Sequence, residues 1–195
     1  MNSEVNIQAL QVFVRQYNLL NDSEVELFTQ DWEEVSYKRK QFIIMAGQTA
    51  KHLYFVNDGI QRSYYIKDDK EYTMGFSYPP SFSGIIESFI TQTPSSYYLE
   101  TLSDSQLLRL SKDKLEELCK QYHSIEHFVR KAEEMFLVGI AKRLYEQTAF
   151  TSEEKFRSLL KRSPHLLTLI PHKYIASYIG VDPTNFSKFL KSIRI

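Results

Sequence analysis

The sequence of 195 residues contains a single cysteine, Cys119. One thiol cannot build a disulfide framework within the chain, nor supply the several thiolates of an iron–sulfur cluster or a structural zinc site. We interpret Cys119 as a small, partly buried apolar residue. The six glycines lie scattered at positions 47, 59, 75, 84, 139 and 180. They therefore form no glycine-rich loop of the kind that holds nucleotide phosphates.

Long hydrophobic runs are also missing. The longest apolar stretch, around Phe136–Ala141, is far shorter than the roughly 20 residues of a membrane-spanning helix. The first twenty residues mix polar side chains with apolar ones, which is not the pattern of a signal-peptide core. Hydrophobic residues make up 43% of the chain and charged residues 25%, as in ordinary globular proteins. We expect a cytoplasmic protein with no membrane partner.

The net charge of zero hides an asymmetry between the two ends of the chain. Residues 151–195 contain eight basic and three acidic side chains, whereas residues 1–150 contain 16 basic and 21 acidic ones. An acidic body followed by a basic segment is typical of a protein with an anion-binding module at its C-terminal end. The alternative is a chance division of solvated surface charges.

Short β-branched or aromatic runs and turn residues alternate in the first part of the chain. Two helices are predicted first, over 4–19 and 23–30, with Asp22 or Ser23 as the cap of the second. The predicted strands are 34–36, 41–45, 52–57, 61–66, 72–77, 97–102 and 105–110. Asp58-Gly59 favours a tight turn between two antiparallel strands, because glycine adopts positive φ at low cost. The even strand spacing indicates an antiparallel sandwich or barrel.

Helical patterns follow from Ser111, which caps a helix over 112–122. The next helix, predicted over 124–149, has two apolar stripes: Ile125, Val129, Ala132, Phe136 and Gly139 form one, and Phe128, Met135, Leu137, Ile140 and Leu144 form the other. A small domain cannot easily bury both faces of so long a helix. We expect one stripe to pack on the β-domain and the other on the same helix of a second chain. Packing of both stripes within one chain is the alternative.

The last segment predicts two short helices joined by a tight turn. Thr151-Ser152-Glu153-Glu154 has the form of a capping box, and Pro164 ends the helix that it begins. Pro171 opens a helix to Ile179, Gly180 ends it, and Asp182-Pro183 opens the last one. The apolar residues fall where two crossed helices touch: Ile175, Ala176, Ile179, Val181, Phe186, Phe189 and Leu190. This is the helix-turn-helix arrangement; a purely structural helical hairpin is the alternative.

The order of these elements resembles the Crp/Fnr superfamily of transcription regulators. The segments that carry the resemblance are Leu53–Ile60, Glu71–Phe76 and Ile170–Pro183. It implies an α+β fold: an N-terminal antiparallel double-stranded β-helix (β-roll) with flanking helices over 1–123, a long dimerisation helix over 124–150 and a C-terminal helix-turn-helix domain over 151–195. The implied function is that of a homodimeric, sequence-specific DNA-binding transcription regulator. Double-stranded DNA and RNA polymerase are the implied partners.

In such a regulator the first helix of the hairpin crosses the phosphate backbone and the second lies in the major groove. We expect Lys173 and Tyr174 to contact the backbone. The side chains expected at base edges are Thr184, Asn185, Ser187 and Lys188, because their apolar neighbours face inward. Lys191 and Arg194 lie further along the helix and are expected to meet phosphates.

The sequence departs from the family in the effector loop. Cyclic-nucleotide binders of this fold have a Gly-Glu pair whose carboxylate accepts from the ribose, and an arginine, followed by Ser or Thr, that binds the phosphate. Gapless alignment retains Gly84 but puts Ile85 at the glutamate position and Ser95 and Ser96 at the Arg-Ser/Thr positions. Glu87 is a candidate replacement for the carboxylate. We expect no cofactor and no binding of cyclic AMP, with an unknown small molecule as the possible effector.

Two other classes of function stay open at this point. The first is a small-molecule sensor or cyclic-nucleotide-binding module whose helical C-terminus serves protein contacts, although the basic charge of that segment argues against it. The second is an enzyme with a double-stranded β-helix fold, which would need metal-spaced histidines and carboxylates on its strands, where His52 stands alone. His123 and His127 lie four apart but lack a third ligand. We therefore predict no catalytic residue and no metal site.

Overall fold

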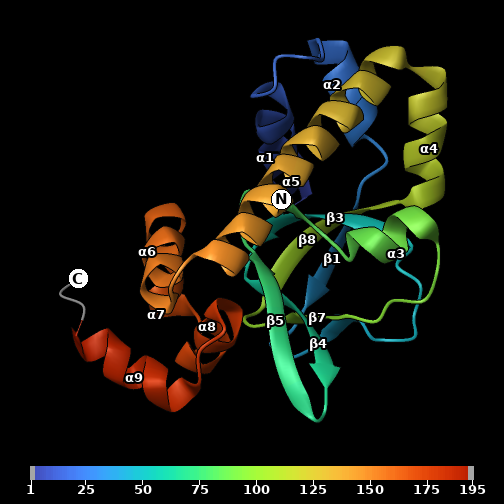
Figure 1. The fold of residues 1–195 in the computed structure, drawn as a ribbon. Helices are drawn as coiled ribbons and strands as arrows, with labels where there is room; N and C mark the ends of the chain where they lie inside the picture. The colour runs from blue at the N-terminus through green and yellow to red at the C-terminus, as the bar shows by residue number, and fades with distance from the viewer. Residues whose placement is uncertain (1–2, 193–195) are drawn as a thin grey trace. The chain divides into compact units, whose positions relative to one another are not determined.

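The computed structural model describes the backbone of residues 3–192 and the side chains of residues 7–187 and of Leu190. The chain forms two compact units. The first comprises Met1–Tyr65 and Phe76–Glu133, and the second comprises Ile66–Gly75 and Glu134–Ile195. One strand hairpin and one long helix pass from the first unit into the second (Figure 1). The three-part division predicted from the sequence stays a prediction.

The strands form two antiparallel four-stranded sheets, which belong to the first unit apart from residues 66–75. The strands are β1 (Glu33–Tyr37), β2 (Phe42–Ile44), β3 (His52–Asp58), β4 (Gln61–Lys67), β5 (Lys70–Ser77), β6 (Ser81–Ser83), β7 (Tyr98–Thr101) and β8 (Ser105–Ser111). Their order is β1-β8-β3-β6 in one sheet and β2-β7-β4-β5 in the other. The predicted α+β fold with its antiparallel β-roll is thereby confirmed. β6 was not predicted, because the three residues Ser-Phe-Ser form too short a run and contain no β-branched residue.

Helices cover one face of the first sheet. They are α1 (Ser3–Arg15), α2 (Asp22–Thr29), α4 (Lys112–Gln121) and the first turns of α5 (His123–Ala149), while the short α3 (Ile86–Thr91) lies in the predicted effector loop. The ring of Phe13 on α1 lies 5.4 Å from those of Phe55 and Phe82 on the sheet. Phe28 on α2 contacts Phe128 on α5 at 5.2 Å. These aromatic contacts join sheet and helices into one core.

The cap of α2 differs from the prediction. Asn21, rather than Asp22 or Ser23, accepts a hydrogen bond from the Glu24 amide at 3.0 Å, and the Glu24 carboxylate accepts from the Asn21 amide at 2.9 Å. This reciprocal pair is a capping box, which requires the acid three residues after the cap. Asp22 instead lies in the first turn and pairs with Arg15 at 3.0 Å.

The turn at Asp58-Gly59 is present, but its predicted role was wrong. Gly59 has a φ of +90°, yet β3 and β4 belong to different sheets. The turn therefore carries the chain across the sandwich and does not close a hairpin. The local sequence cannot distinguish the two roles, because both require a positive φ. The backbone here is crowded: a Cβ on Gly59 would lie 2.2 Å from Ser105 Oγ.

The second unit is helical apart from the hairpin segment 66–75. It contains the last turns of α5 followed by α6 (Ser152–Arg162), α7 (Leu166–Leu169), α8 (His172–Ile179) and α9 (Pro183–Ser192). Thr151 begins α6 with the predicted capping box. The buried apolar residues of this unit are Phe156, Leu159, Leu166, Ile170, Ile175, Ala176, Ile179 and Phe186. The rings of Phe156 and Phe186 meet edge to face at 5.4 Å, joining α6 to α9.

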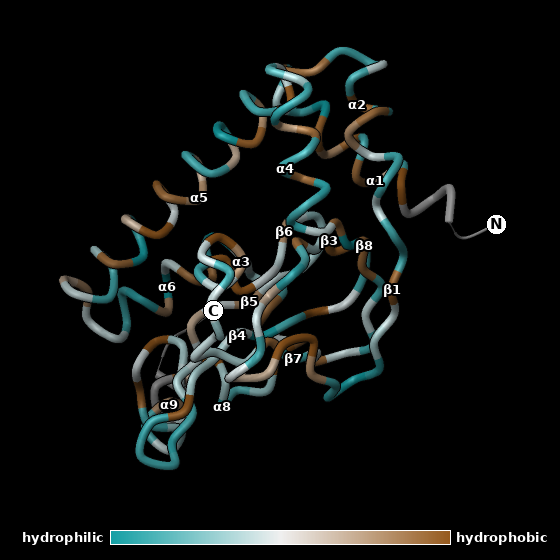
Figure 2. Tube along the Cα trace, turned by 90° about the vertical axis from the view of Figure 1, so that its right-hand side faces the viewer, coloured by the Kyte–Doolittle hydropathy of each residue, from teal (hydrophilic) through white to brown (hydrophobic). Residues whose placement is uncertain are grey.

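The middle of α5, residues 133–142, is exposed around its whole circumference. Phe136, Leu137 and Val138 are 51%, 67% and 68% exposed, and apolar residues recur along this helix in Figure 2. Ile125 and Phe128, from different stripes, are both buried. The first turns of both stripes are therefore buried in the core of the first unit. The expectation that one stripe packs on the β-domain and the other on a second chain stays a prediction. Among the described residues, no helix has the length and apolar character needed to cross a membrane.

We predict that Gly59→Ala destabilises the chain more than Gly47→Ala. Gly47 has nearly the same φ, +88°, but no atom lies within 4 Å of a Cβ placed there. Gly47→Ala should cost about 1–2 kcal/mol for the left-handed backbone, and Gly59→Ala about 1–3 kcal/mol more for the collision. Denaturant unfolding of the two variants checks this. Equal losses would show that the crowding at Gly59 carries no energetic weight.

Candidate nucleic-acid interface and effector pocket

The turn between α8 and α9 has the geometry that its sequence predicts. Gly180 ends α8 in the left-handed region at φ +76°, and the Val181 amide donates to the Ala176 carbonyl at 2.9 Å. Asp182 Oδ1 then accepts from the Thr184 amide at 2.8 Å, which caps the start of α9. Gly180, Asp182 and Pro183 thus form a tight turn of three residues between the end of α8 and the start of α9. We refer to residues 172–192 as the HTH hairpin.

The HTH hairpin has a closed apolar side and an exposed polar side. Ala176 and Phe186 have no exposed surface, and the Phe186 ring contacts that of His172 at 5.9 Å. Because Phe186 points inward, its neighbours Thr184, Asn185 and Ser187 are exposed on the first turns of α9. The side chains of Lys188 and Lys191, the other residues predicted on this helix, lie outside the described residues, as does Arg194.

The predicted backbone contacts lie at the start of α8. Lys173 is exposed and Tyr174 is half-buried. The Lys173 ammonium lies 4.7 Å from the centroid of the Tyr174 ring, a cation–π distance. This contact keeps the charge at the surface beside an aromatic side chain. The assignment of Lys173 and Tyr174 to phosphate contacts stays a prediction.

The last turn of α8 is held by the hairpin segment 66–75 within the second unit. The Thr73 amide donates to the Ser177 hydroxyl at 3.0 Å, and that hydroxyl donates to the Glu71 carbonyl at 3.1 Å. The side chain of Ser177 thus bonds to the backbone of β5 as a neighbouring strand would. This role of Ser177 was not predicted from the sequence, because its partners lie about a hundred residues earlier in the chain.

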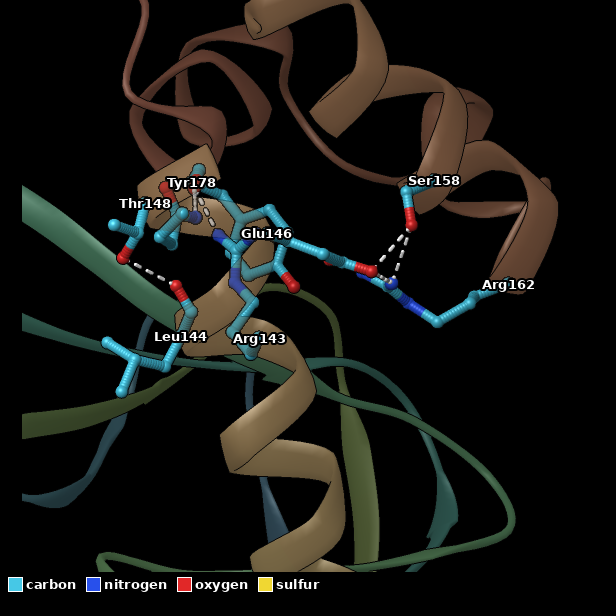
Figure 3. A network of polar contacts seen from close by, with 8 residues as sticks. Arg143, Leu144, Glu146, Thr148, Ser158, Arg162 and Tyr178 are labelled. Carbon is cyan, nitrogen blue, oxygen red and sulfur yellow. Dashed lines mark hydrogen bonds and ion pairs between the residues drawn. The ribbon is translucent and has the colours of Figure 1, made fainter. Parts of the chain in front are cut away.

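A polar cluster joins the end of α5 to α6 and α8 (Figure 3). Glu146, 1% exposed, accepts hydrogen bonds from Ser158 at 2.7 Å and from Arg162. Arg143 donates to the Tyr178 carbonyl, and its guanidinium lies 3.6 Å from the centroid of the Tyr178 ring. This cluster was not predicted from the sequence, because its members have the pattern of ordinary surface charges on helices and meet only in the folded chain.

Burial and charge act in opposite directions on the ionisable groups of this cluster. Burial disfavours the charged form of Glu146, but hydrogen bonds from Arg162 and Ser158 and the positive charges of Arg162 and Arg143 outweigh it, so the pKa of Glu146 lies below its ordinary value. Burial lowers the pKa of Arg143, which stays a cation at neutral pH because an arginine begins so high. The cluster is therefore a charged one.

The five predicted effector-loop residues occupy different environments. Ile85 is buried, 5% exposed, at the residue before α3, whereas Glu87 and Ser96 are exposed. Gly84 is half-buried, with a φ of +153°. Ser95 is buried, and its hydroxyl donates to the Tyr97 carbonyl at 3.0 Å while accepting from the Tyr97 amide at 2.8 Å. The single hydroxyl proton of Ser95 is thus already used within the loop.

A polar cavity in the first unit was not predicted. It has a volume of about 240 Å³ and is lined by Asp31, Glu33, His52, Arg109, Ser111 and Lys114. Its charges pair with one another: Arg109 donates two hydrogen bonds to Glu33 at 2.9 and 3.0 Å, and Lys114 lies 3.3 Å from Asp31. Burial and the Arg109 charge lower the pKa of His52. Four of the six lining residues are thus held in ion pairs with one another.

The cap at Asp182 generates a test of the hairpin geometry. Hydrogen bonds from the Thr184 and Asn185 amides lower the pKa of Asp182. The stabilisation from the charged cap is therefore present above the ordinary carboxyl pKa of about 3.9 and is lost as the pH falls through the lowered value. At pH 7, Asp182→Ala should lower the melting temperature and speed amide exchange at Thr184 several-fold, whereas Asp182→Asn keeps an acceptor and should remain close to wild type.

Melting curves and amide exchange at pH 7 check this prediction, and melting curves repeated below pH 4 check its sign. The advantage of the wild type over Asp182→Ala should shrink in the acid. Unchanged exchange at Thr184 in Asp182→Ala would show that this hydrogen bond does not hold the first turn of α9.

The chain is similar to known proteins over both units. Residues 34–122 match the cyclic nucleotide-binding domain family, and a search of curated protein sequences finds no match. FixK2 from Bradyrhizobium japonicum aligns with a TM-score of 0.71 at 17% identity, over 82% of this chain and 83% of that chain. The global regulator CLP from Xanthomonas campestris gives 0.65 at 17% identity, over 88% and 90%.

A third structure, from Eubacterium rectale, is described as a transcriptional regulator of the Crp/Fnr family. It aligns with a TM-score of 0.68 at 14% identity, over 90% of this chain and 84% of that chain. The resemblance seen in the sequence is thereby confirmed at the level of the fold: the chain has the fold of these Crp/Fnr-type structures, and its residues 34–122 match the cyclic nucleotide-binding domain family.

Proposed function

We propose that the chain is a homodimeric, sequence-specific DNA-binding transcription regulator. The observation that carries this proposal is the HTH hairpin, whose second helix has a buried apolar side and exposes Thr184, Asn185 and Ser187 in its first turns. Asparagine pairs well with adenine in the major groove, and hydroxyls pair with several bases. The excess of basic residues over 151–195 supplies the charge that a phosphate backbone attracts.

Dimerisation through α5 is the second part of the proposal. Large apolar side chains exposed over two helical turns are rare on a monomer surface. A two-fold axis beside α5 would cover them with the same residues of a second chain. It would also present two copies of α9 to one face of a duplex, where half-sites lie about 34 Å apart.

The effector domain is the third part, and we infer that it does not bind cyclic AMP. Ile85 is an apolar residue where the ribose needs an acceptor, and the Ser95 hydroxyl is already bonded to Tyr97. A buried phosphate without a paired cation is costly. CLP is described as responsive to cyclic di-GMP, a ligand with two phosphates, for which the same argument holds.

A sensor module with a protein-contact hairpin is the alternative. The match to the cyclic nucleotide-binding domain family favours a ligand-binding role for residues 34–122, which a DNA-binding regulator also has. CLP is described as a global regulator and the Eubacterium rectale structure as a transcriptional regulator of the Crp/Fnr family, which supports a role in regulation. DNA binding discriminates between the regulator and the sensor.

The first test is a gel shift with fragments of the host genome. The full chain should retain a subset of fragments, and the retained sequence serves as the operator. On that operator Asn185→Ala should cost about 1–3 kcal/mol and relax the base preference locally. Lys173→Ala should weaken all sequences alike and reduce the salt slope by about one. Lys120→Ala, an exposed lysine on α4, is the matched control and should bind as wild type.

A wild-type chain that retains no fragment would leave the sensor as the remaining function. An Asn185→Ala variant with unchanged affinity and base preference would contradict the placement of α9 in the groove.

The second test concerns assembly. Phe136→Glu should convert a dimer into a monomer, because it puts a charge into the apolar surface that two copies of α5 would share. Val12→Glu replaces another exposed apolar residue, on α1, and should leave the dimer intact. Light scattering at micromolar concentration measures the mass. Val129 is not a useful target, because it packs against the core of the first unit. A monomeric wild type would contradict this part of the proposal.

The third test concerns the ligand. Calorimetric titration with cyclic AMP, cyclic GMP or cyclic di-GMP should show no heat of binding at submillimolar ligand. The physical reason is the missing cation at Ser95, since a neutral hydrogen bond contributes roughly 1 kcal/mol against 1.5–3 for a charged one. A micromolar dissociation constant would show that another residue supplies the charge.

A further inference from the structure

The buried carboxylate of Glu146 is the starting point. A charge removed from water is costly unless hydrogen bonds and opposite charges compensate. Glu146 lies on α5, and the side chains that compensate come from both its own helix and α6: Arg143 lies 4.0 Å away, and Ser158 and Arg162 donate to it. The cost of burial is met only while α5 and α6 keep one relative position. The contacts of Glu146 with Ser158 and Arg162 therefore favour one orientation of α6 on α5.

The same stretch of α5 also holds α8. Arg143 and Gln147 both donate to the Tyr178 carbonyl, the latter at 3.1 Å. This carbonyl lies in the last turn of α8, where backbone acceptors have no partner within the helix and a cation is favoured. The Arg143 guanidinium also stacks on the Tyr178 ring. Figure 3 shows the two sets of contacts side by side around α5.

Fixing α8 also fixes α9. Three residues separate the helices, and Ala176 and Phe186 close the space between them. The orientation of α9 on α5 therefore depends on Arg143 and Glu146, whose contacts hold α6 and the end of α8. In a two-fold dimer the angle between α5 and the HTH hairpin sets the separation of the two copies of α9.

We propose that Arg143 and Glu146 are positioning residues that set the angle of the HTH hairpin on α5 and thereby the half-site spacing that the dimer accepts. The inference rests on the proposed function, because it concerns the same DNA-binding surface. The proposal gives both side chains a role through their contacts within the second unit and assigns neither a contact with DNA. Substituting them should change the preference of the dimer for one half-site spacing, and not its preference for a particular base.

The experiment uses the full chain and duplexes in which the two operator half-sites stand at their natural spacing or with one or two base pairs inserted or removed. Each added base pair moves a half-site by about 3.4 Å and rotates it by roughly one tenth of a turn. The wild type should bind the natural spacing at least tenfold more tightly than the altered ones. Arg143→Lys keeps the charge but loses the planar fork and the stack on Tyr178, and it should reduce that preference to threefold or less.

Glu146→Gln keeps the shape and loses the charge, and it should reduce the preference in the same way. The matched controls are Arg157→Lys and Glu153→Gln, which alter an Arg–Glu pair on the exposed side of α6, 2.7 Å between Nη2 and Oε1. They should keep the wild-type preference. Gln147→Ala removes a donor to the Tyr178 carbonyl and leaves Glu146 paired, so it tests the inference if the other variants fail to fold. It should reduce the preference by a smaller factor.

Three outcomes are distinguishable. Folded, dimeric variants that accept altered spacings support the inference. Variants that lose affinity equally at all spacings, or keep the wild-type preference, overturn it and leave the proposed function standing. A wild type that binds no duplex overturns the proposed function, and the inference falls with it.

Discussion

The exposed apolar middle of α5 is the constraint on which the functional account depends. The first turns of the helix are anchored in the core of the first unit by Ile125 and Phe128, and its last turns are held in the second unit by Arg143 and Glu146. Between these anchors the apolar side chains of residues 133–142 lie in water. Burying a side chain such as Phe136 stabilises by about 1.5–3 kcal/mol, so several of them provide a strong drive toward a second surface.

Burial of charge has the opposite role at the end of the same helix. An apolar contact is tolerant of angle, because the hydrophobic effect has no direction. The contacts of Glu146 with Ser158 and Arg162 are directional, because a buried carboxylate loses stability when its donors move. The two kinds of contact therefore have different roles in this account. The apolar surface favours association of α5 with a second chain, and the polar cluster gives the HTH hairpin a defined orientation on α5.

The features that the sequence predicts correctly are those encoded within a few residues. Ser111, Thr151, Asp182 and Gly180 each cap or end a helix where predicted, because the interacting groups are at most five residues apart. The cap at Asn21 was not predicted, because Asn21, Asp22 and Ser23 are all residue types that cap helices. Asn21 is the cap in the structure because Glu24, three residues later, completes the capping box with it. The sheet assignment of β3 and β4 depends on partners elsewhere in the chain, which a local turn signal does not contain.

The candidate sites divide in the same way. The exposed face of α9 follows from the spacing of Phe186 among its polar neighbours, so Thr184, Asn185 and Ser187 could be assigned from the sequence. The cluster around Glu146 joins residues up to 35 positions apart, and each member alone has the appearance of a solvated charge. The hydrogen bonds of Ser95 could not be predicted from the sequence either. Its hydroxyl bonds to the backbone of Tyr97 in a turn whose shape depends on the strands that flank it.

The symmetry of the bound DNA tests the central claim most directly. Random duplexes selected by the full chain and then sequenced would give the site that one protein particle recognises. The account predicts an inverted repeat whose half-site centres lie 10 to 10.5 base pairs apart, about one helical turn, because two copies of α9 related by a two-fold axis would read it. Enrichment of a single, unrepeated half-site, or no enrichment at all, would contradict the claim.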